Sequence, residues 1–292
     1  MNKKIETNML ETMVDKQFTL NSNMNGIHWI FGKTTADLPE HEKVINWGRT
    51  IYMEVLELIE SYPWKHWADL NAITDKLNVK IELADIWHFI LSLLIEYAFS
   101  QYFEAVKKEN KGLVITRETV SADQIQDMWD SHIKHSVVTY FEEVIKVEEE
   151  NKSTSKIIRT KYDNAREGEK EFVPFEELAI SAMILSTIAN HTEETLEQKM
   201  GLVVSVITIF HTIINEYVEI DLELIYMGKT VLNQFRQDHG YKKIDSDSKK
   251  NYKKLWNFNG EVVEDNVVMF SFLKEGITDK ELYILLEQSY KA

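Results

Sequence analysis

The sequence predicts an all-α protein built as a multi-helix bundle. Only 3 Pro and 10 Gly interrupt its 292 residues, and these are the residue types that most often break helices. The long windows between them are rich in Leu, Ile, Glu and Lys, which favour helix. Long helices and few strands are therefore expected. The absence of cysteine excludes disulfides, zinc thiolate sites and a cysteine nucleophile.

The first expected elements are helices separated by loops. A helix over 7–20 gives way to the segment 21–26 (NSNMNG), which is typical of a turn-rich hinge. A helix from about Glu40 to Ser61 ends before Pro63, because the residue before a proline is pushed out of the helical region. A longer helix is expected from about residue 79 to 106, and the two long helices would pack antiparallel.

The second half begins with a change in character. Residues 107–170 carry charged and polar runs, and we expect a helical insertion with solvated links there. Further helices are expected at 175–190, 194–220, 222–238 and 279–289, with a polar and aromatic segment at 241–266. We therefore expect residues 1–292 to form one all-α domain with an insertion at about 107–170.

Charge and hydropathy exclude two classes of protein. The formal charge is −15, with 48 acidic against 33 basic residues, whereas a protein that binds nucleic-acid duplexes normally has the opposite excess. The N-terminal residues lack the apolar core of a signal peptide, and no run of 18 apolar residues is free of polar interruption. We expect a soluble, cytoplasmic protein with no nucleic-acid and no membrane partner.

Four carboxylates form the most informative pattern. Glu54 and Glu57 are three residues apart, as are Glu82 and Asp85, so each pair projects from one helical stripe. The second pair lies in the run 81–95, which is apolar almost all round and therefore belongs to a core helix. Ionised carboxylates there are costly unless a cation compensates them. An all-oxygen ligand set suits Mg²⁺ or Mn²⁺, and Mg²⁺ also binds substrate phosphates.

A second pattern is basic. Lys229, Asn233 and Arg236 fall on one helical face, where a point charge and a planar fork suit phosphate oxygens. Solvated helix faces are the alternative for both patterns, since about 8 acid pairs of this spacing are expected by chance in so acidic a chain. The placement of two acid pairs on adjacent helices is what favours a metal and a phosphate.

Several polar and aromatic residues allow two interpretations each. His88 is either a hydrogen-bonded packing residue of the core or a ligand-binding residue. Asn21 and Asn25 carry the donor and acceptor groups that a pyrimidine edge needs, and they also suit an ordinary turn. His66 and Trp67 fit a nucleobase pocket or a staple between helices.

Together these residues resemble the dimeric dUTPases of the all-α NTP pyrophosphatase superfamily. The stretches that carry the resemblance are 20–26 with Trp29, 49–67, 82–89, 228–236, and 240–242 with Trp256 and 264–266. Their order, and the 25-residue step from Glu57 to Glu82, are similar to those of the family. The resemblance covers roughly half of the chain.

The resemblance implies Mg²⁺-dependent hydrolysis of dUTP, and also of dUDP, to dUMP, with release of pyrophosphate or phosphate by a metal-activated water. The enzyme would be a homodimer with its cleft between a rigid and a mobile helical region. The family's metal motif, which holds two or three Mg²⁺ ions or Mn²⁺ as a substitute, carries onto Glu54, Glu57, Glu82 and Asp85. Glu54 or Glu57 would take the proton of the water. Base and sugar contacts carry onto the region from Asn21 to Asn25, His66 and His88, and phosphate contacts onto Lys229, Asn233, Arg236 and Lys242. Trp67, next to His66, is a further candidate for substrate binding.

Three alternatives stay open at this stage. A related pyrophosphatase for dCTP or a wider set of nucleoside triphosphates would share the four acids, since base choice depends on the Asn and His contacts. A carboxylate-bridged di-iron bundle needs Glu-x-x-His twice, and only Asp85-x-x-His88 comes near that motif. A helical interaction protein without chemistry would carry the acidic stripe incidentally.

Overall fold

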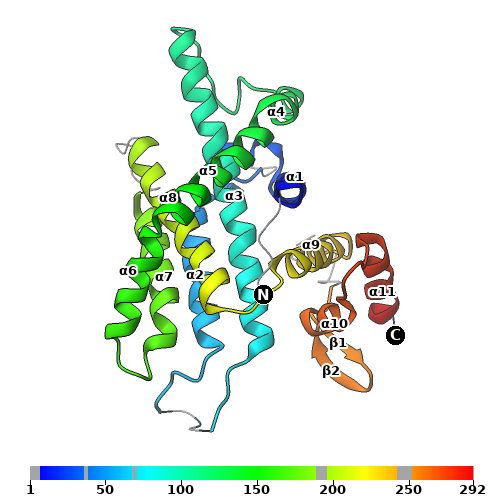
Figure 1. Ribbon diagram of the computed structural model, residues 1–292. Coiled ribbons are helices and arrows are strands. Elements are labelled where there is room, and N and C mark those ends of the chain that lie inside the picture. Colours follow the sequence, from blue (N-terminus) through cyan, green and yellow to red (C-terminus); the bar gives the residue numbers. More distant parts are fainter. Residues whose placement is uncertain are drawn as a thin grey trace.

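The structure is a computed structural model that describes residues 7–35, 39–67, 69, 71–188, 196–241 and 252–291. It is all-α, as the sequence predicts, and the one sheet within these residues has two strands. Figure 1 shows a bundle of long helices, with α9 leading to a smaller group of elements beside it.

The bundle contains α1 (Thr7–Asn25), α2 (Trp47–Glu60), α3 (Lys76–Glu109), α4 (Ala122–Met128), α5 (Lys134–Asn151), α6 (Ser153–Asn164), α7 (Val173–Ile188) and α8 (Leu196–Thr212). Next come α9 (Leu222–Asp238) and the C-terminal group, which is β1 (Leu255–Phe258), β2 (Glu261–Glu264), α10 (Asp265–Phe272) and α11 (Asp279–Lys291). Single 3-10 turns lie at Ile27–Phe31, Pro39–His41 and Lys170–Phe172, and π turns at Trp129–Ile133 and Ile213–Tyr217.

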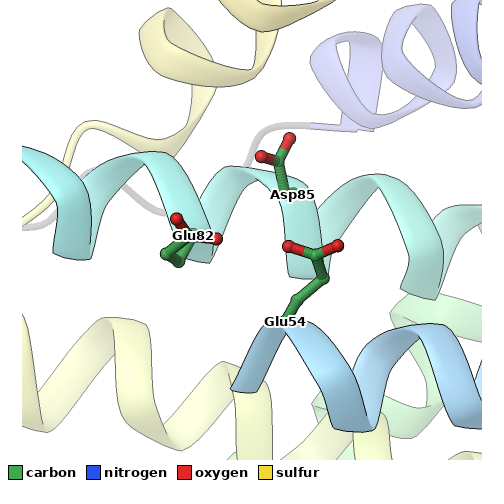
Figure 2. Close-up of side chains that lie close together, drawn as sticks. All are labelled: Glu54, Glu82 and Asp85. Carbon is green, nitrogen blue, oxygen red and sulfur yellow. The ribbon is translucent and has the colours of Figure 1, made fainter. Parts of the chain in front are cut away.

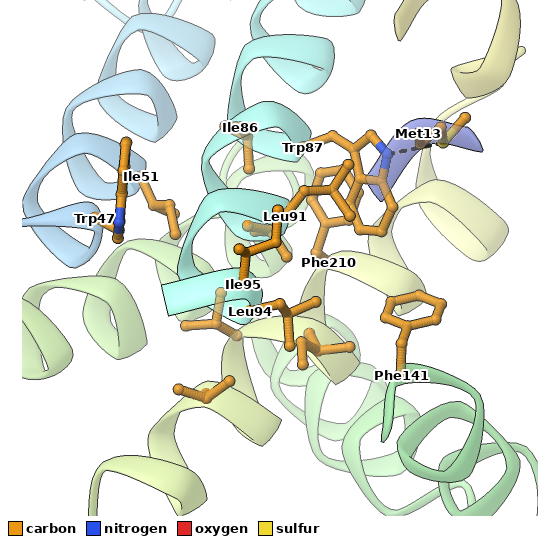
Figure 3. Packing of buried hydrophobic residues seen from close by; sticks show 14 of the residues in the cluster. Met13, Trp47, Ile51, Ile86, Trp87, Leu91, Leu94, Ile95, Phe141 and Phe210 are labelled. Atoms are coloured by element: carbon orange, nitrogen blue, oxygen red, sulfur yellow. Dashed lines mark hydrogen bonds between the residues drawn. The ribbon is translucent and has the colours of Figure 1, made fainter. Parts of the chain in front are cut away.

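The helix α3 is the centre of the bundle. Asp75 caps it by accepting hydrogen bonds from two backbone N–H groups of its first turn. Trp87 of α3 is fully enclosed, because its ring stacks on Phe210 of α8 and its indole N–H donates to the sulfur of Met13 in α1 (Figure 3). By length and composition α3 and the run Gln198–Tyr217 could cross a membrane, but 67% of the apolar window of α3 is buried inside the protein. Such burial is that of a core helix.

The helix α2 is fixed against α3 and α7. Asn46 caps α2 by accepting from the backbone N–H of Arg49, and its side-chain amide donates to the carbonyl of Ser186 in α7. Gly48 allows close approach, since a Cβ there would lie 2.6 Å from the backbone nitrogen of Ser186. These contacts set the position from which α2 presents Glu54 to α3.

Two local predictions were wrong: the helix expected from about Glu40 begins only at Trp47, and the segment 21–26 was expected to be a turn-rich hinge. The segment 21–26 is not a hinge, because α1 continues to Asn25 and only Gly26, with φ of 77°, leaves the helical region. A hydrogen bond from Gln17 to Asn21 supports this last turn. The segment 241–266 contains a β-hairpin, whose two-residue turn Asn259-Gly260 has φ of 53° and 86°. Positive φ at both turn residues is what an Asn-Gly hairpin turn requires.

Candidate active site

Three of the four predicted acids meet between α2 and α3. Glu54 of α2 and Glu82 and Asp85 of α3 each offer an oxygen, and these oxygens lie within 4.8 Å of one another (Figure 2). Glu57 does not join this group, because its side chain is exposed and lines a different pocket. The contribution of Glu57 as a metal ligand therefore stays a prediction.

Burial and mutual repulsion make these acids hard to ionise. Burial, followed by the charge of Asp85, raises the pKa of Glu54 to about 8. The same two causes raise the pKa of Glu82 to about 7. A hydrogen bond also joins the carboxyls of Glu54 and Glu82, so the pair holds a proton at neutral pH. A divalent cation of the Mg²⁺ or Mn²⁺ type would offset this burial and repulsion, and clustered carboxylate oxygens are the ligands that such a cation prefers.

Lys229 is a buried counter-ion of this cluster. Its Nζ lies 2.8 Å from Oδ2 of Asp85 and donates to Oδ1 of Asn266 at 3.2 Å, and its side chain is 2% exposed. Gly228 brings α9 close to α10, since a Cβ there would lie 2.7 Å from the sulfur of Met269. Spacing along one helix could not reveal this ion pair, because it joins residues of α3 and α9. Lys229 therefore balances one acid and would have to leave Asp85, at least in part, to bind a phosphate.

Arg236 is held by the C-terminal group. Its Nε and Nη2 donate to the two carboxylate oxygens of Asp265, each at 2.8 Å, and Tyr252 donates to the same carboxylate at 2.6 Å. Asp265 is completely buried. The Nη1 of Arg236 donates to Asn233 at 3.2 Å. Asp265 thus fixes the guanidinium in one orientation and ties α9 to α10.

A pocket of about 580 Å³ connects the acids with these basic residues. Of the predicted site residues, it is lined by Asn21, Asn25, Glu54, Asp85, His88, Lys229, Asn233 and Arg236. Arg49, which the sequence interpretation did not single out, also lines it with an exposed side chain. The volume is within the usual range for small-molecule sites.

The remaining predicted residues lie elsewhere. His66 lines the same separate pocket as Glu57. Trp67 is 65% exposed and packs edge-on against His66. The structure therefore does not bring these two residues to the main pocket. Lys242 lies outside the described residues.

Two amide side chains that line the pocket, Gln17 and Asn21, meet at one buried hydroxyl. The hydroxyl of Ser92 donates to the backbone carbonyl of His88 at 2.8 Å, so its oxygen accepts from the side-chain amides of Gln17 at 3.0 Å and Asn21 at 2.8 Å. Both amides are thereby oriented, and Oε1 of Gln17 faces Nδ1 of His88 at 2.6 Å. Because a carbonyl oxygen can only accept, Nδ1 carries the proton.

His88 is therefore a neutral acceptor. Burial lowers its pKa to about 3, and its Nε2 is buried without a hydrogen-bond partner among the described residues. With the proton on Nδ1, this nitrogen presents a lone pair. The sequence interpretation missed the role of Ser92, although a serine one turn after a histidine in an apolar run is a signal for such a contact.

Comparison with known proteins identifies the family. A family model described as dUTPase matches residues 9–169, which is more than half of the chain. The chain belongs to the dUTPase family. No curated protein matches the chain closely enough to add to this finding.

Membership makes the protein a dUTP diphosphatase, an enzyme with a nucleotide substrate, as the resemblance implies. The dUTPase family is generally metal-dependent, which agrees with the acidic cluster. The matched range contains Glu54, Glu82, Asp85 and His88 and ends before α9. It also contains most of 107–170, and the nature of that segment as an insertion stays a prediction.

Proposed function

We propose that this enzyme hydrolyses dUTP, and also dUDP, to dUMP in a Mg²⁺-dependent reaction in the pocket between α2, α3 and α9. One observation carries the proposal. Three acids have oxygens within 4.8 Å of one another, and two of them, Glu54 and Asp85, line a pocket with Lys229, Arg236 and His88, whose buried Nε2 has no hydrogen-bond partner among the described residues. A nucleotide matches these features, because its base can donate to the acceptor and its phosphates can bind both the basic residues and a metal.

The acidic cluster would hold the cation. Glu54, Glu82 and Asp85 would be the ligands of two or three Mg²⁺ ions, or of Mn²⁺, with Glu57 as a further ligand. When bound, the metal neutralises the phosphate oxygens and lowers the pKa of a coordinated water. Glu54 is our candidate for the base, because burial raises its pKa to about 8, so its carboxylate, once ionised, accepts a proton more readily than an ordinary glutamate does.

The residues of α9 would bind the phosphates. Lys229 and Arg236 place their charges on one face of the helix, and Asn233 lies between them in the same pocket. Asp265 limits the guanidinium to one orientation, so little conformational entropy is lost when a phosphate binds. Lys242 would contact the same phosphates.

The base end of the pocket favours uracil over cytosine. The Nε2 lone pair of His88 can accept the N3–H of uracil, whereas N3 of cytosine has a lone pair and no proton. Cytosine would leave a buried acceptor unpaired, which costs about 1–3 kcal/mol, or roughly 5- to 150-fold in affinity. Asn21 would contact the neighbouring carbonyl groups of the base. The acceptor therefore supports dUTP over the alternative of dCTP or a wider set of nucleoside triphosphates.

We further propose that the enzyme is a cytoplasmic homodimer with one all-α domain per chain, which rests on the resemblance. One feature agrees with an interface. On α7 the side chains of Ile180, Met183 and Ile184 are 47, 44 and 40% exposed, and they form an apolar face of the kind that a partner covers. Light scattering from the purified protein tests the dimer.

Pyrophosphate release from a panel of dUTP, dCTP, dTTP and UTP, each with Mg²⁺ or with EDTA, tests the function. We expect rapid turnover of dUTP with Mg²⁺, none with EDTA, and at least tenfold slower turnover of dCTP. Equal rates for all four nucleotides would favour the broader pyrophosphatase. The absence of turnover of dUTP with Mg²⁺ would refute the proposal.

A further inference from the structure

We propose that Ser92 sets the base preference of this site by fixing the tautomer of His88. The inference rests on the proposed function for the identity of the base, but the tautomer is a property of the protein alone. Ser92 is completely buried and is not among the residues that line the pocket. It is therefore a positioning residue that acts through other side chains and touches no substrate.

The hydroxyl of Ser92 determines the orientation of the side-chain amides that contact it. A hydroxyl has one proton, and that proton is used on the carbonyl of His88 one turn earlier. The oxygen of Ser92 therefore attracts only N–H donors from Gln17 and Asn21. An amide that donates through its nitrogen on one side must present its oxygen on the other, so Gln17 turns Oε1 to His88.

One further contact agrees with this orientation, because Oδ1 of Asn21 accepts from Nε2 of Gln17 at 3.3 Å. The hydroxyl of Tyr226 lies 2.8 Å from the carbonyl of Met13 and 3.2 Å from Oε1 of Gln17, and it can donate its one proton to either oxygen. The ring of Tyr226 packs on the ring of His88 with centroids 4.2 Å apart, and this contact restricts rotation of the imidazole.

Burial makes the choice of tautomer depend on Ser92. Gln17, Asn21 and His88 are 2, 5 and 3% exposed, so bulk water cannot replace a lost partner. Without the hydroxyl, the amide of Gln17 is free to present Nε2 to His88. His88 would then accept at Nδ1 and carry its proton on Nε2, which suits N3 of cytosine and repels the N3–H of uracil.

The substitution Ser92→Ala tests the proposal, with Ser100→Ala as a matched control. Ser100 also lies on α3, and its hydroxyl donates to the carbonyl of Glu96 one turn earlier at 3.0 Å. It is not bonded to Gln17, Asn21 or His88. Both variants remove the same kind of hydroxyl from the same helix, so a general effect on α3 would appear in both. Ser92→Thr keeps the hydroxyl and serves as the rescue variant.

The first readout is the tautomer of His88 in protein without metal and without nucleotide. Ring ¹⁵N chemical shifts from a long-range ¹H–¹⁵N spectrum show which nitrogen carries the proton, and the His88→Gln spectrum assigns the signals. We expect the proton on Nδ1 in the wild type, Ser100→Ala and Ser92→Thr, and a substantial Nε2–H population in Ser92→Ala. A wild-type proton on Nε2 overturns the proposal, even where Ser92→Ala does not fold.

The second readout is the ratio of kcat/KM for dUTP to that for dCTP. We expect Ser92→Ala to lower this ratio at least tenfold through a higher KM for dUTP, with Mg²⁺ affinity unchanged, and Ser100→Ala to leave the ratio unchanged. A changed tautomer with an unchanged ratio overturns the role of Ser92 in base preference. If the wild type does not turn over dUTP with Mg²⁺, the proposed function fails, and the tautomer spectrum still decides the structural part.

Discussion

The substitution Glu82→Gln should stabilise the metal-free enzyme at alkaline pH and abolish its Mg²⁺-dependent turnover. In the folded protein, burial and then the charge of Asp85 raise the pKa of Glu82 from 4.5 to about 7. Between these two values the unfolded chain loses a proton that the folded protein keeps, so the free energy of unfolding falls as pH rises through this window. Because Gln cannot ionise, the variant does not undergo this fall in the free energy of unfolding.

The size of the effect follows from the shift in pKa. A change from 4.5 to about 7 corresponds to roughly 3 kcal/mol at a pH above 7. Loss of the hydrogen bond with Glu54 removes about 1 kcal/mol of this gain. We expect a net gain of about 2 kcal/mol, which is a rise in Tm of about 3 °C for a chain of this size.

Thermal unfolding in EDTA at pH 5 and pH 8.5 measures this difference. The control is Glu104→Gln, which removes an exposed carboxylate from the same helix α3. We expect a higher Tm for Glu82→Gln at pH 8.5, little change at pH 5, and no comparable shift for the control. A lower Tm at pH 8.5, an equal shift at both pH values, or turnover within tenfold of the wild type would refute the reasoning.

Three more outcomes test the cluster and its partners. Mg²⁺ binding at pH 7 should release on the order of one proton, because the cation replaces the protons of Glu54 and Glu82. For the same reason, the affinity for Mg²⁺ should rise as the pH approaches 8. Calorimetry in two buffers of different ionisation enthalpy measures the released protons, and the absence of release would mean that these acids are already ionised. Lys229→Met should raise the KM for dUTP and strengthen Mg²⁺ binding without nucleotide, because Asp85 loses its counter-ion; unchanged Mg²⁺ affinity in calorimetry would contradict this. Asp265→Asn should lower the free energy of unfolding by about 3–5 kcal/mol, because it leaves the charge of Arg236 buried and poorly paired; denaturant unfolding within 1 kcal/mol of the wild type would argue against it.

Local sequence signals predicted the helices and the acids well. The expected helix 222–238 coincides with α9, since Asp221 caps its start and Gly240, with φ of 77°, follows its end. Spacing of three residues placed each acid pair on one helical stripe, and packing of α2 against α3 brought Glu54, Glu82 and Asp85 together. Such signals are short-range, so a single sequence carries them.

Partnerships between distant helices could not be predicted in the same way. The periodicity of α9 shows that Lys229 and Arg236 share a face, but it does not show that Asp85 and Asp265 meet that face. The orientation of the amides near His88 depends on Ser92, a residue of α3, and on Gln17, a residue of α1. These contacts follow from tertiary packing, which also kept the last turn of α1 helical where composition favoured a loop.

Anomalous diffraction from crystals grown with Mn²⁺ and a non-hydrolysable dUTP analogue tests the central claim most directly. We predict an anomalous peak within coordination distance of carboxylate oxygens of Glu54, Glu82 and Asp85, with analogue phosphates on the same ion and Lys229 turned toward them. A Mn²⁺ peak elsewhere, or the three acids without an ion while Lys229 still pairs with Asp85, would contradict the account.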